Sequence, residues 1–208
     1  MIKFSTFLIE KTDAKSVLHA FDMDEVLVHH DHNKLRIHVV DPYGNRVRTL
    51  TNQEFNTHKL PQGHKYDFSE FRSSDVFSKS SAPIRKMIAK LKAIHQNGGK
   101  TAIITARGDL DSQPHFAQQM KKYGIDIGQT HVYRAGNLKG RTSDNKAIIV
   151  DGLIKKYGVK KVHLYDDSEE NLNTFLKLKS KHPEVEFNAH HVEHNPKTEK
   201  VSINTRKI

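Results

Sequence analysis

Two pairs of aspartates stand at places where carboxylates could act on a phosphate or hold a metal ion. Asp22 and Asp24 follow the apolar run 17–21, and Asp166 and Asp167 follow a second apolar run later in the chain. Two carboxylates one residue apart in an extended turn can converge on a single hard cation through side-chain and backbone oxygens. Acidic residues are common at strand ends, so each pair alone is a weak indication of function.

Two further residues add to this pattern. Thr105 ends the short apolar stretch 100–105, and Lys146 lies in the first turn of a helix that we expect to begin near Thr142. A lysine and a helix N-terminus both favour a bound anion. The four features together predict phosphate chemistry at a single site.

The elements that must position these residues follow from the spacing of apolar side chains. From about residue 83 the chain alternates between helical spacing and short apolar runs. Serine, threonine or proline begins each expected helix, and glycine ends most of them. We expect helices that start at Pro83, Ser112, Thr142 and Ser168, and strands at 17–21, 100–105, 131–134, 162–165 and 185–187.

This alternation predicts the α/β class, with a doubly wound (Rossmann-like) parallel sheet flanked by helices. Helical crossovers in such sheets are almost always right-handed, so the carboxyl ends of the parallel strands share one edge. Ligands bind at that edge, near the point where the strand order reverses. The two aspartate pairs, Thr105 and the helix that carries Lys146 are therefore expected to meet there.

Residues 29–82 do not follow the alternation, and they are predicted to form a small insertion after the first strand. The segments 35–40 and 46–50 flank a stretch of turn-forming residues, which is typical of a β-hairpin. Residues 51–82 are polar and poor in periodicity, and we interpret them as an ordered loop or a small lid. The polar tail after His194 is expected to be peripheral.

Composition limits the class of protein. The 208 residues fit a single domain over 1–208, and their 36% hydrophobic content suffices for a core. Cysteine is absent, which excludes disulfides and thiolate metal sites in this sequence. No apolar run approaches the roughly 20 residues that span a bilayer, and the first residues do not resemble a secretory signal, so we expect a soluble cytoplasmic protein without membrane contact. The sequence does not predict an oligomeric state.

The formal net charge of +10 is spread along the chain. Such a charge favours polyanionic partners, because it raises the local concentration of phosphate-rich ligands and steers their approach. A solvated basic surface explains the same charge equally well. The charge by itself does not separate nucleic acid from a nucleotide or a phosphoprotein.

At four places the sequence resembles the haloacid dehalogenase superfamily, on its phosphatase branch. The matching segments, in the order of the family's four motifs, are Phe21-Asp22-Met23-Asp24-Glu25-Val26, Ile103-Ile104-Thr105-Ala106-Arg107, Lys146 and Leu164-Tyr165-Asp166-Asp167. The resemblance covers roughly residues 17–187 and leaves the insertion only loosely matched. Glu25 stands where many members carry glycine, which alters the turn but removes no catalytic group. Asp24 matters because members that act on phosphate keep this aspartate and dehalogenases do not.

The resemblance implies a Mg²⁺-dependent phosphatase that hydrolyses a phosphomonoester. Asp22 would attack phosphorus and form an aspartyl-phosphate, and Asp24 would protonate the leaving oxygen and later deprotonate water. The implied Mg²⁺ ligands are Asp22, the backbone carbonyl of Asp24, Asp167 directly, and Asp166 nearby or through water. The implied phosphate-binding groups are Thr105 with the adjacent backbone of Ala106 and Arg107, together with Lys146.

Two rivals to this enzyme are considered. A phosphoacceptor receiver domain uses similar groups, but it would require a lone phosphorylated aspartate in mid-chain and a lysine after it. Here Lys146 precedes the final acidic pair, and no suitable mid-chain aspartate follows a strand. The second rival is a catalytically idle protein of the same fold that binds nucleic acid through its basic surface. For the enzyme, the basic charge and the small insertion favour a nucleotide or a terminal phosphate of nucleic acid as the substrate.

Several other residues allow more than one interpretation. Arg107 either reaches the substrate or is a solvent-exposed loop arginine. His29, His30 and His32 are interpreted as solvated or substrate-facing in preference to a zinc site, because no regular ligand spacing recurs. In the insertion, the candidates for substrate selection are the basic Lys59, His64, Lys65 and Arg72 and the aromatic Tyr66, Phe68 and Phe71, although local core packing also explains the aromatic ones.

The first ten residues, 1–10, are similar to the short capsid-targeting peptides of some large tailed phages. Those peptides are cleaved after a Leu/Ile-x-Glu sequence, which Leu8-Ile9-Glu10 matches. The similarity implies a phage-encoded protein packaged in a virion, as an alternative to a cytoplasmic one. An amphipathic start that packs Phe4, Phe7 and Leu8 on the domain is the simpler explanation.

Overall fold

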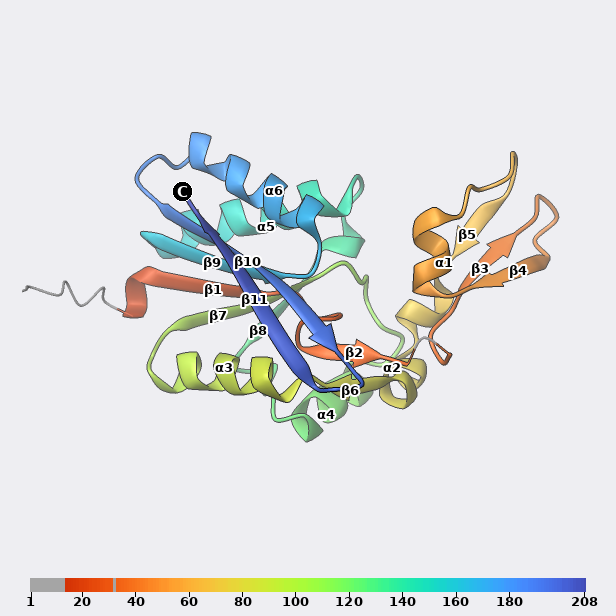
Figure 1. Ribbon diagram of the computed structural model, residues 1–208, viewed down its shortest axis with the longest axis horizontal. Coiled ribbons are helices and arrows are strands. Elements are labelled where there is room, and N and C mark those ends of the chain that lie inside the picture. The colour runs from red at the N-terminus through yellow and green to blue at the C-terminus, as the bar shows by residue number, and fades with distance from the viewer. Residues whose placement is uncertain (1–13, 32) are drawn as a thin grey trace, which may run out of the picture.

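A six-stranded sheet forms the centre of the protein (Figure 1). The computed structural model describes residues 14–31 and 33–208, so the possible targeting peptide 1–10 lies outside the described residues. In spatial order the strands are β11 (Lys200–Lys207), β10 (Glu186–Asn195), β9 (Lys161–Asp166), β1 (Val17–Phe21), β7 (Lys100–Thr105) and β8 (His131–Arg134). All neighbouring pairs are parallel except β10 and β11. The predicted α/β sheet is therefore confirmed, with one antiparallel edge strand that makes it mixed.

Helices cover both faces of this sheet, as the doubly wound prediction requires (Figure 1). The helices α3 (Arg85–Gln96) and α4 (Gln113–Lys122) pack on one face, and α5 (Thr142–Tyr157) and α6 (Glu169–Leu176) pack on the other. Each face has its own apolar core. The first contains Phe21, Ile103, Met87, Leu91, Phe116 and Met120, and the second contains Ala20, Ile104, Leu164, Val150, Ile154 and Phe175.

The predicted helix boundaries hold where a capping residue defines them. The Ser112 hydroxyl accepts a hydrogen bond from the backbone N–H of His115, and the Ser168 hydroxyl caps α6 in the same way. Gly158 ends α5 with a φ of 58°, in the left-handed region that glycine tolerates best. The prediction that Pro83 starts a helix is wrong. Pro83 ends the short strand β6 (Ser81–Pro83), because pairing with β2 (Val28–His30) keeps this segment extended and delays α3 to Arg85.

The C-terminal region departs most from the prediction. The expected short strand 185–187 is the start of β10, and the tail that was expected to be peripheral forms β11 along the edge of the sheet. Val192 and Val201 of this hairpin are buried in the core beneath α3. The polar composition hides the strands because one side of an edge hairpin faces solvent, so only alternate residues need to be apolar.

The insertion has its own three-stranded antiparallel sheet, which lies beside the main sheet in Figure 1. Its strands are β3 (Ile37–Val40), β4 (Arg46–Leu50) and β5 (Lys65–Asp67), in the order β4-β3-β5, and β3 and β4 pair as the predicted hairpin does. The interpretation of 51–82 as a loop is wrong. This stretch contains β5, β6, the helices α1 (Asn52–Thr57) and α2 (Ser74–Ser80), and the 3-10 turn η2 (Ser69–Arg72). Its helices are too short to show a clear apolar periodicity.

Three further 3-10 turns connect the elements of the main sheet. They are η1 (Ala14–Ser16), η3 (Ala135–Asn137) and η4 (Lys177–Ser180). Among the described residues, no helix is long and apolar enough to cross a membrane.

Candidate active site at the carboxyl edge of the sheet

The aspartate pairs meet where the strand order reverses. From β1 the chain passes to β7 and β8 on one side and later to β9 and β10 on the other, so β1 and β9 are neighbours whose loops diverge. The backbone N–H of Asp22 donates to the carbonyl of Tyr165 at 2.8 Å, which extends the pairing of the two strands to the first aspartate. Asp22 and Asp166 therefore lie side by side at the edge where α/β sheets bind ligands.

Lys146 bridges these two aspartates. Its Nζ lies 2.9 Å from Asp22 Oδ2 and 2.8 Å from Asp166 Oδ2. All three residues are buried, with 2% exposure for Lys146, 5% for Asp22 and 0% for Asp166. Because α5 begins at Thr142, Lys146 is in its second turn and not in the first turn as predicted. A lysine one turn further into the helix still reaches the sheet edge, because side chains tilt toward the helix N-terminus.

The remaining oxygens of the two aspartates are also held. Asp22 Oδ1 accepts a hydrogen bond from the backbone N–H of Met23 at 2.8 Å. Asp166 Oδ1 accepts from the backbone N–H of Ser168 and from the side-chain amide of Asn171, at 3.0 and 2.9 Å. The geometry of both carboxylates is therefore set before any ligand arrives.

The cluster carries more negative than positive charge. One oxygen each of Asp22, Asp166 and Asp167 lie within 4.8 Å of one another, while Lys146 is the ammonium that contacts the cluster. Three ionised carboxylates and one ammonium leave two negative charges without compensation. Burial raises the pKa of Asp22 well above its usual value, and burial together with Asp166 raises the pKa of Asp167 to about 6.

Lys146 itself stays protonated in this surrounding. Burial alone would lower the pKa of its ammonium, but the carboxylates of Asp22 and Asp166 outweigh burial and raise the pKa above its ordinary value. The carboxylate set fits a hard divalent cation, because it offers oxygen ligands at one point and an excess of charge that such an ion would balance.

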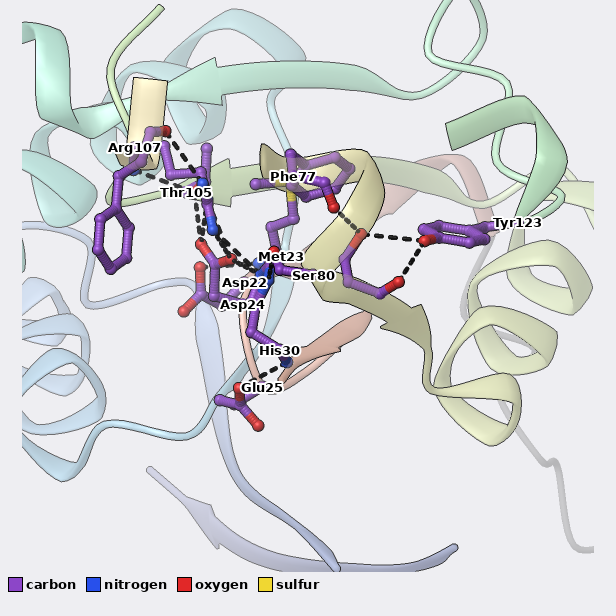
Figure 2. A network of polar contacts seen from close by, with 12 residues as sticks. Asp22, Met23, Asp24, Glu25, His30, Phe77, Ser80, Thr105, Arg107 and Tyr123 are labelled. Atoms are coloured by element: carbon purple, nitrogen blue, oxygen red, sulfur yellow. Dashed lines mark hydrogen bonds and ion pairs between the residues drawn. The ribbon is translucent and has the colours of Figure 1, made fainter. Parts of the chain in front are cut away.

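Asp24 has a different environment from Asp22, although it is only two residues further along the chain. Arg107 grips its carboxylate from one side, with Nε 3.0 Å from both oxygens and Nη2 2.9 Å from Oδ1. His30 Nε2 lies 2.6 Å from the same Oδ1 (Figure 2). Burial alone would raise the pKa of Asp24, but Arg107 and His30 outweigh it and hold the pKa well below its usual range. Asp24 is thus an ionised carboxylate in this structure.

Arg107 is fixed by the insertion as well as by Asp24. Its Nη1 donates to the backbone carbonyl of Phe71 at 3.0 Å, and its guanidinium lies between the rings of Phe71 and Phe77, 5.0 and 5.4 Å from their centroids. Only 3% of Arg107 is exposed, so the interpretation as a solvent-exposed loop arginine is wrong. Aromatic faces on both sides suit the delocalised charge of a guanidinium.

Thr105 contacts both Asp24 and the backbone of Arg107. Its hydroxyl accepts a hydrogen bond from the backbone N–H of Arg107 at 3.1 Å and lies 3.4 Å from Asp24 Oδ2 (Figure 2). Ala106 and Arg107 line a hollow of about 480 Å³ beside this centre, together with Asp24 and with Thr142 at the start of α5. The insertion closes the other side of the hollow with Phe55, Phe68, Phe71 and Arg72.

His30 is a site residue whose contact with Asp24 the sequence did not predict. It was interpreted as solvated or substrate-facing, yet it is 3% exposed, with Nδ1 3.1 Å from the hydroxyl of Ser80 and Nε2 against Asp24. The pairing of β2 with β6 carries His30 back over the first motif, which no local pattern reveals.

Glu25 explains how the chain turns after Asp24. It adopts a φ of 59°, in the left-handed region that disfavours residues with a side chain, and its N–H donates to the carbonyl of Val28 at 2.6 Å. Its carboxylate accepts a hydrogen bond from the backbone N–H of His30 at 3.2 Å. The turn is therefore the one that glycine would make more easily, and Glu25 compensates by tying it to β2.

Comparison with known proteins gives a likeness of structure but none of sequence. A scan against protein-family models and a search of curated proteins gave no match. A solved structure described as an archaeal beta-phosphoglucomutase from the hyperthermophilic Pyrococcus sp. strain ST 04 superposes with a TM-score of 0.44 at 12% sequence identity. The alignment covers 76% of this chain and 81% of that chain.

Proposed function

We propose that the protein is a Mg²⁺-dependent phosphatase that hydrolyses a phosphomonoester through an aspartyl-phosphate on Asp22. The observation that carries the proposal is the buried set of Asp22, Lys146 and Asp166 with Asp167 within reach, at the strand-order reversal of an α/β sheet. The four motif residues from separate parts of the sequence resemble the phosphatase branch of the haloacid dehalogenase superfamily, and the fold brings them to one edge.

In the first step, an Asp22 carboxylate oxygen would attack phosphorus. The new oxygen–phosphorus bond forms as the bond to the leaving oxygen breaks, and the leaving oxygen takes a proton from Asp24. Lys146 and Thr105 would stabilise charge on the transferring phosphoryl group. In the second step, water attacks the aspartyl-phosphate and gives its proton to Asp24, which releases inorganic phosphate and restores Asp22.

Asp22, Asp166 and Asp167, with the backbone carbonyl of Asp24, would hold Mg²⁺. When bound, the ion would supply positive charge that offsets the repulsion between these carboxylates and an anionic phosphate. The excess of two negative charges in the cluster supports this assignment, because Lys146 balances only one of the three carboxylates.

Asp24 suits one of its two roles directly. As an ionised carboxylate next to Thr105, it is ready to accept the proton of water in the second step. To donate a proton in the first step it must part from Arg107, whose guanidinium holds it ionised. An incoming phosphate dianion offers Arg107 an alternative bidentate partner, which would release Asp24 as the substrate enters.

The proposal is tested with p-nitrophenyl phosphate and Mg²⁺. Wild type should turn over this substrate, and the isosteric variant Asp22→Asn should lose about a thousandfold or more in kcat/KM, because the nucleophile is removed. Asp75→Asn on the exposed face of α2 is the matched control, since Asp75 forms a surface ion pair with Lys79, its single ion-pair partner among the described residues. An inactive wild type, or an Asp22→Asn variant as active as the control, would favour the idle nucleic-acid-binding protein instead.

A further inference from the structure

A second hollow adjoins the one beside the candidate active site. It has a volume of about 540 Å³ on the surface of the insertion, and Arg46, Lys65, Tyr66 and Asp67 are among the residues that line it. Both hollows share Phe68 and Arg72, which lie at their junction. A ligand that enters at the reaction centre can therefore continue along the insertion without leaving a lined surface.

The junction carries an exposed aromatic ring on a rigid support. Phe68 is 42% exposed, and its ring centroid lies 5.5 Å from that of Phe55 and 6.1 Å from that of Phe71. The ring of Tyr66 lies 6.0 Å from that of Phe68 and 4.8 Å from that of Phe55, so the three rings form one cluster. Edge contacts hold the ring while part of it faces solvent, which is an arrangement that suits stacking of a planar base.

The two hollows are also lined by cationic side chains that form no ion pair with the described residues. Arg72 and Lys65 are exposed, and neither forms an ion pair within residues 14–31 and 33–208. Arg46 is different, because its guanidinium contacts Asp67 and Ser69 at 3.0 and 3.3 Å. Two unneutralised cations beside a stacking ring match the alternation of phosphate and base along a single strand.

We propose that the substrate is the phosphorylated end of a single-stranded nucleic acid, held by the insertion. The base next to the reacting phosphate stacks on Phe68, and the adjoining phosphates of the strand lie against Arg72 and Lys65. This inference rests on the proposed phosphatase function of the same centre. A mononucleotide fills the first hollow only and leaves Lys65 without a ligand, and a phosphopeptide offers no repeating charge to match both cations.

The first experiment measures kcat/KM for substrates of increasing length. An octanucleotide with a terminal phosphate, at either the 3′ or the 5′ end, should exceed the matching mononucleotide by at least about tenfold, because one stacked base contributes roughly 5- to 150-fold. A phosphopeptide and a duplex with a blunt phosphorylated end are the comparison substrates. Equal rates on octanucleotide and mononucleotide, or a preference for phosphopeptide, would overturn the inference.

The second experiment measures binding without turnover. Fluorescence anisotropy with a labelled octanucleotide uses the Asp22→Asn protein, in which Phe68→Ala or Phe68→Leu should weaken binding about 5- to 100-fold. The Lys65→Gln/Arg72→Gln variant should lower the slope of log affinity against log salt by about 0.7 for each lost phosphate contact. Tyr43→Ala and Lys92→Gln are matched controls, because Tyr43 is 90% exposed at the hairpin tip and Lys92 lines neither hollow.

The two experiments separate this inference from the proposed function. If the protein hydrolyses p-nitrophenyl phosphate but shows no preference for longer oligonucleotides, the phosphatase function is supported and the nucleic-acid substrate is contradicted. If the protein binds the octanucleotide through Phe68, Lys65 and Arg72 but hydrolyses no substrate, the nucleic-acid site along the two hollows is supported and the phosphatase function is contradicted. If the Phe68 variants and the Lys65→Gln/Arg72→Gln variant bind the octanucleotide as tightly as the controls do, the proposed nucleic-acid site is contradicted. Circular dichroism melting checks that each variant is folded.

Discussion

Replacing Lys146 by methionine tests whether the aspartate cluster has the charge balance described above. The substitution keeps an unbranched side chain, one atom shorter, and removes the ammonium that contacts Asp22 at 2.9 Å and Asp166 at 2.8 Å. Both carboxylates are at least 95% buried, so water does not replace the lost partner. The variant thus leaves buried negative charges facing one another.

The expected loss of stability is large. Removing one partner of a buried ion pair costs about 3–5 kcal/mol, out of a total free energy of unfolding of about 5–15 kcal/mol for a typical domain. Lys155→Met is the matched control on the same helix. Lys155 is exposed and pairs with Asp151 four residues earlier at 2.7 Å, and such surface pairs contribute about 0.3–0.5 kcal/mol.

The assay is urea unfolding, followed by circular dichroism without metal at pH 8 and at pH 5.5. Burial already raises the pKa of Asp22, and the loss of Lys146 removes the one group that lowers it most. A carboxyl whose folded pKa exceeds its unfolded value binds more protons in the folded state, so the folded state gains stability as pH falls. The deficit of Lys146→Met should therefore shrink at pH 5.5. A deficit within about 1 kcal/mol of the Lys155→Met control at pH 8, or one that is equal at both pH values, would refute the charge balance.

Three further outcomes are expected. Glu25→Gly should be more stable than Glu25→Ala by about 1–2 kcal/mol in urea unfolding, because both lose the hydrogen bond to β2 but only glycine relieves the left-handed φ of 59°. Burial lowers the pKa of His19, His163 and His190 to about 4, below the unfolded value near 6.5, so the free energy of unfolding should fall as pH drops from 6.5 to 4. Each histidine contributes up to about 3 kcal/mol before solvent screening reduces it, and His163→Gln should flatten this dependence. Mg²⁺ at about a hundredfold its Kd should raise unfolding stability by about 2.7 kcal/mol in a thermal melt, a gain that Asp167→Asn should reduce.

The position of the candidate site follows from the sequence because topology determines it. Parallel strands joined by right-handed crossovers must present their carboxyl ends together, so Asp22, Thr105 and Asp166 could be assigned to one edge from their places after apolar runs. The hydroxyl caps of α4 and α6 were equally readable, because a cap and its helix are neighbours in the chain. Local pattern and global fold agree at these positions.

The partners of Asp24 could not be predicted in the same way. Arg107 reaches it from the loop after β7 and His30 from β2, and the Phe71 carbonyl that holds Arg107 comes from the insertion. These contacts depend on how a polar segment without clear periodicity packs on the main sheet, which sequence spacing does not specify. Strand β11 was missed for a related reason, since an edge strand with one solvated side needs few apolar residues.

The surroundings shift the pKa values of the two aspartates of the first motif in opposite directions. Asp22 lies in a cluster with excess negative charge, and its pKa is raised, whereas Asp24 is neutralised by Arg107, and its pKa is lowered. A nucleophile must be ionised and a general acid must be protonated, so the raised pKa of Asp22 opposes its role as nucleophile and the lowered pKa of Asp24 opposes its role as acid, while the ionised form of Asp24 suits its role as base. Added positive charge at the carboxylate cluster would lower the pKa of Asp22 again. A phosphate that draws Arg107 away would raise the pKa of Asp24 again.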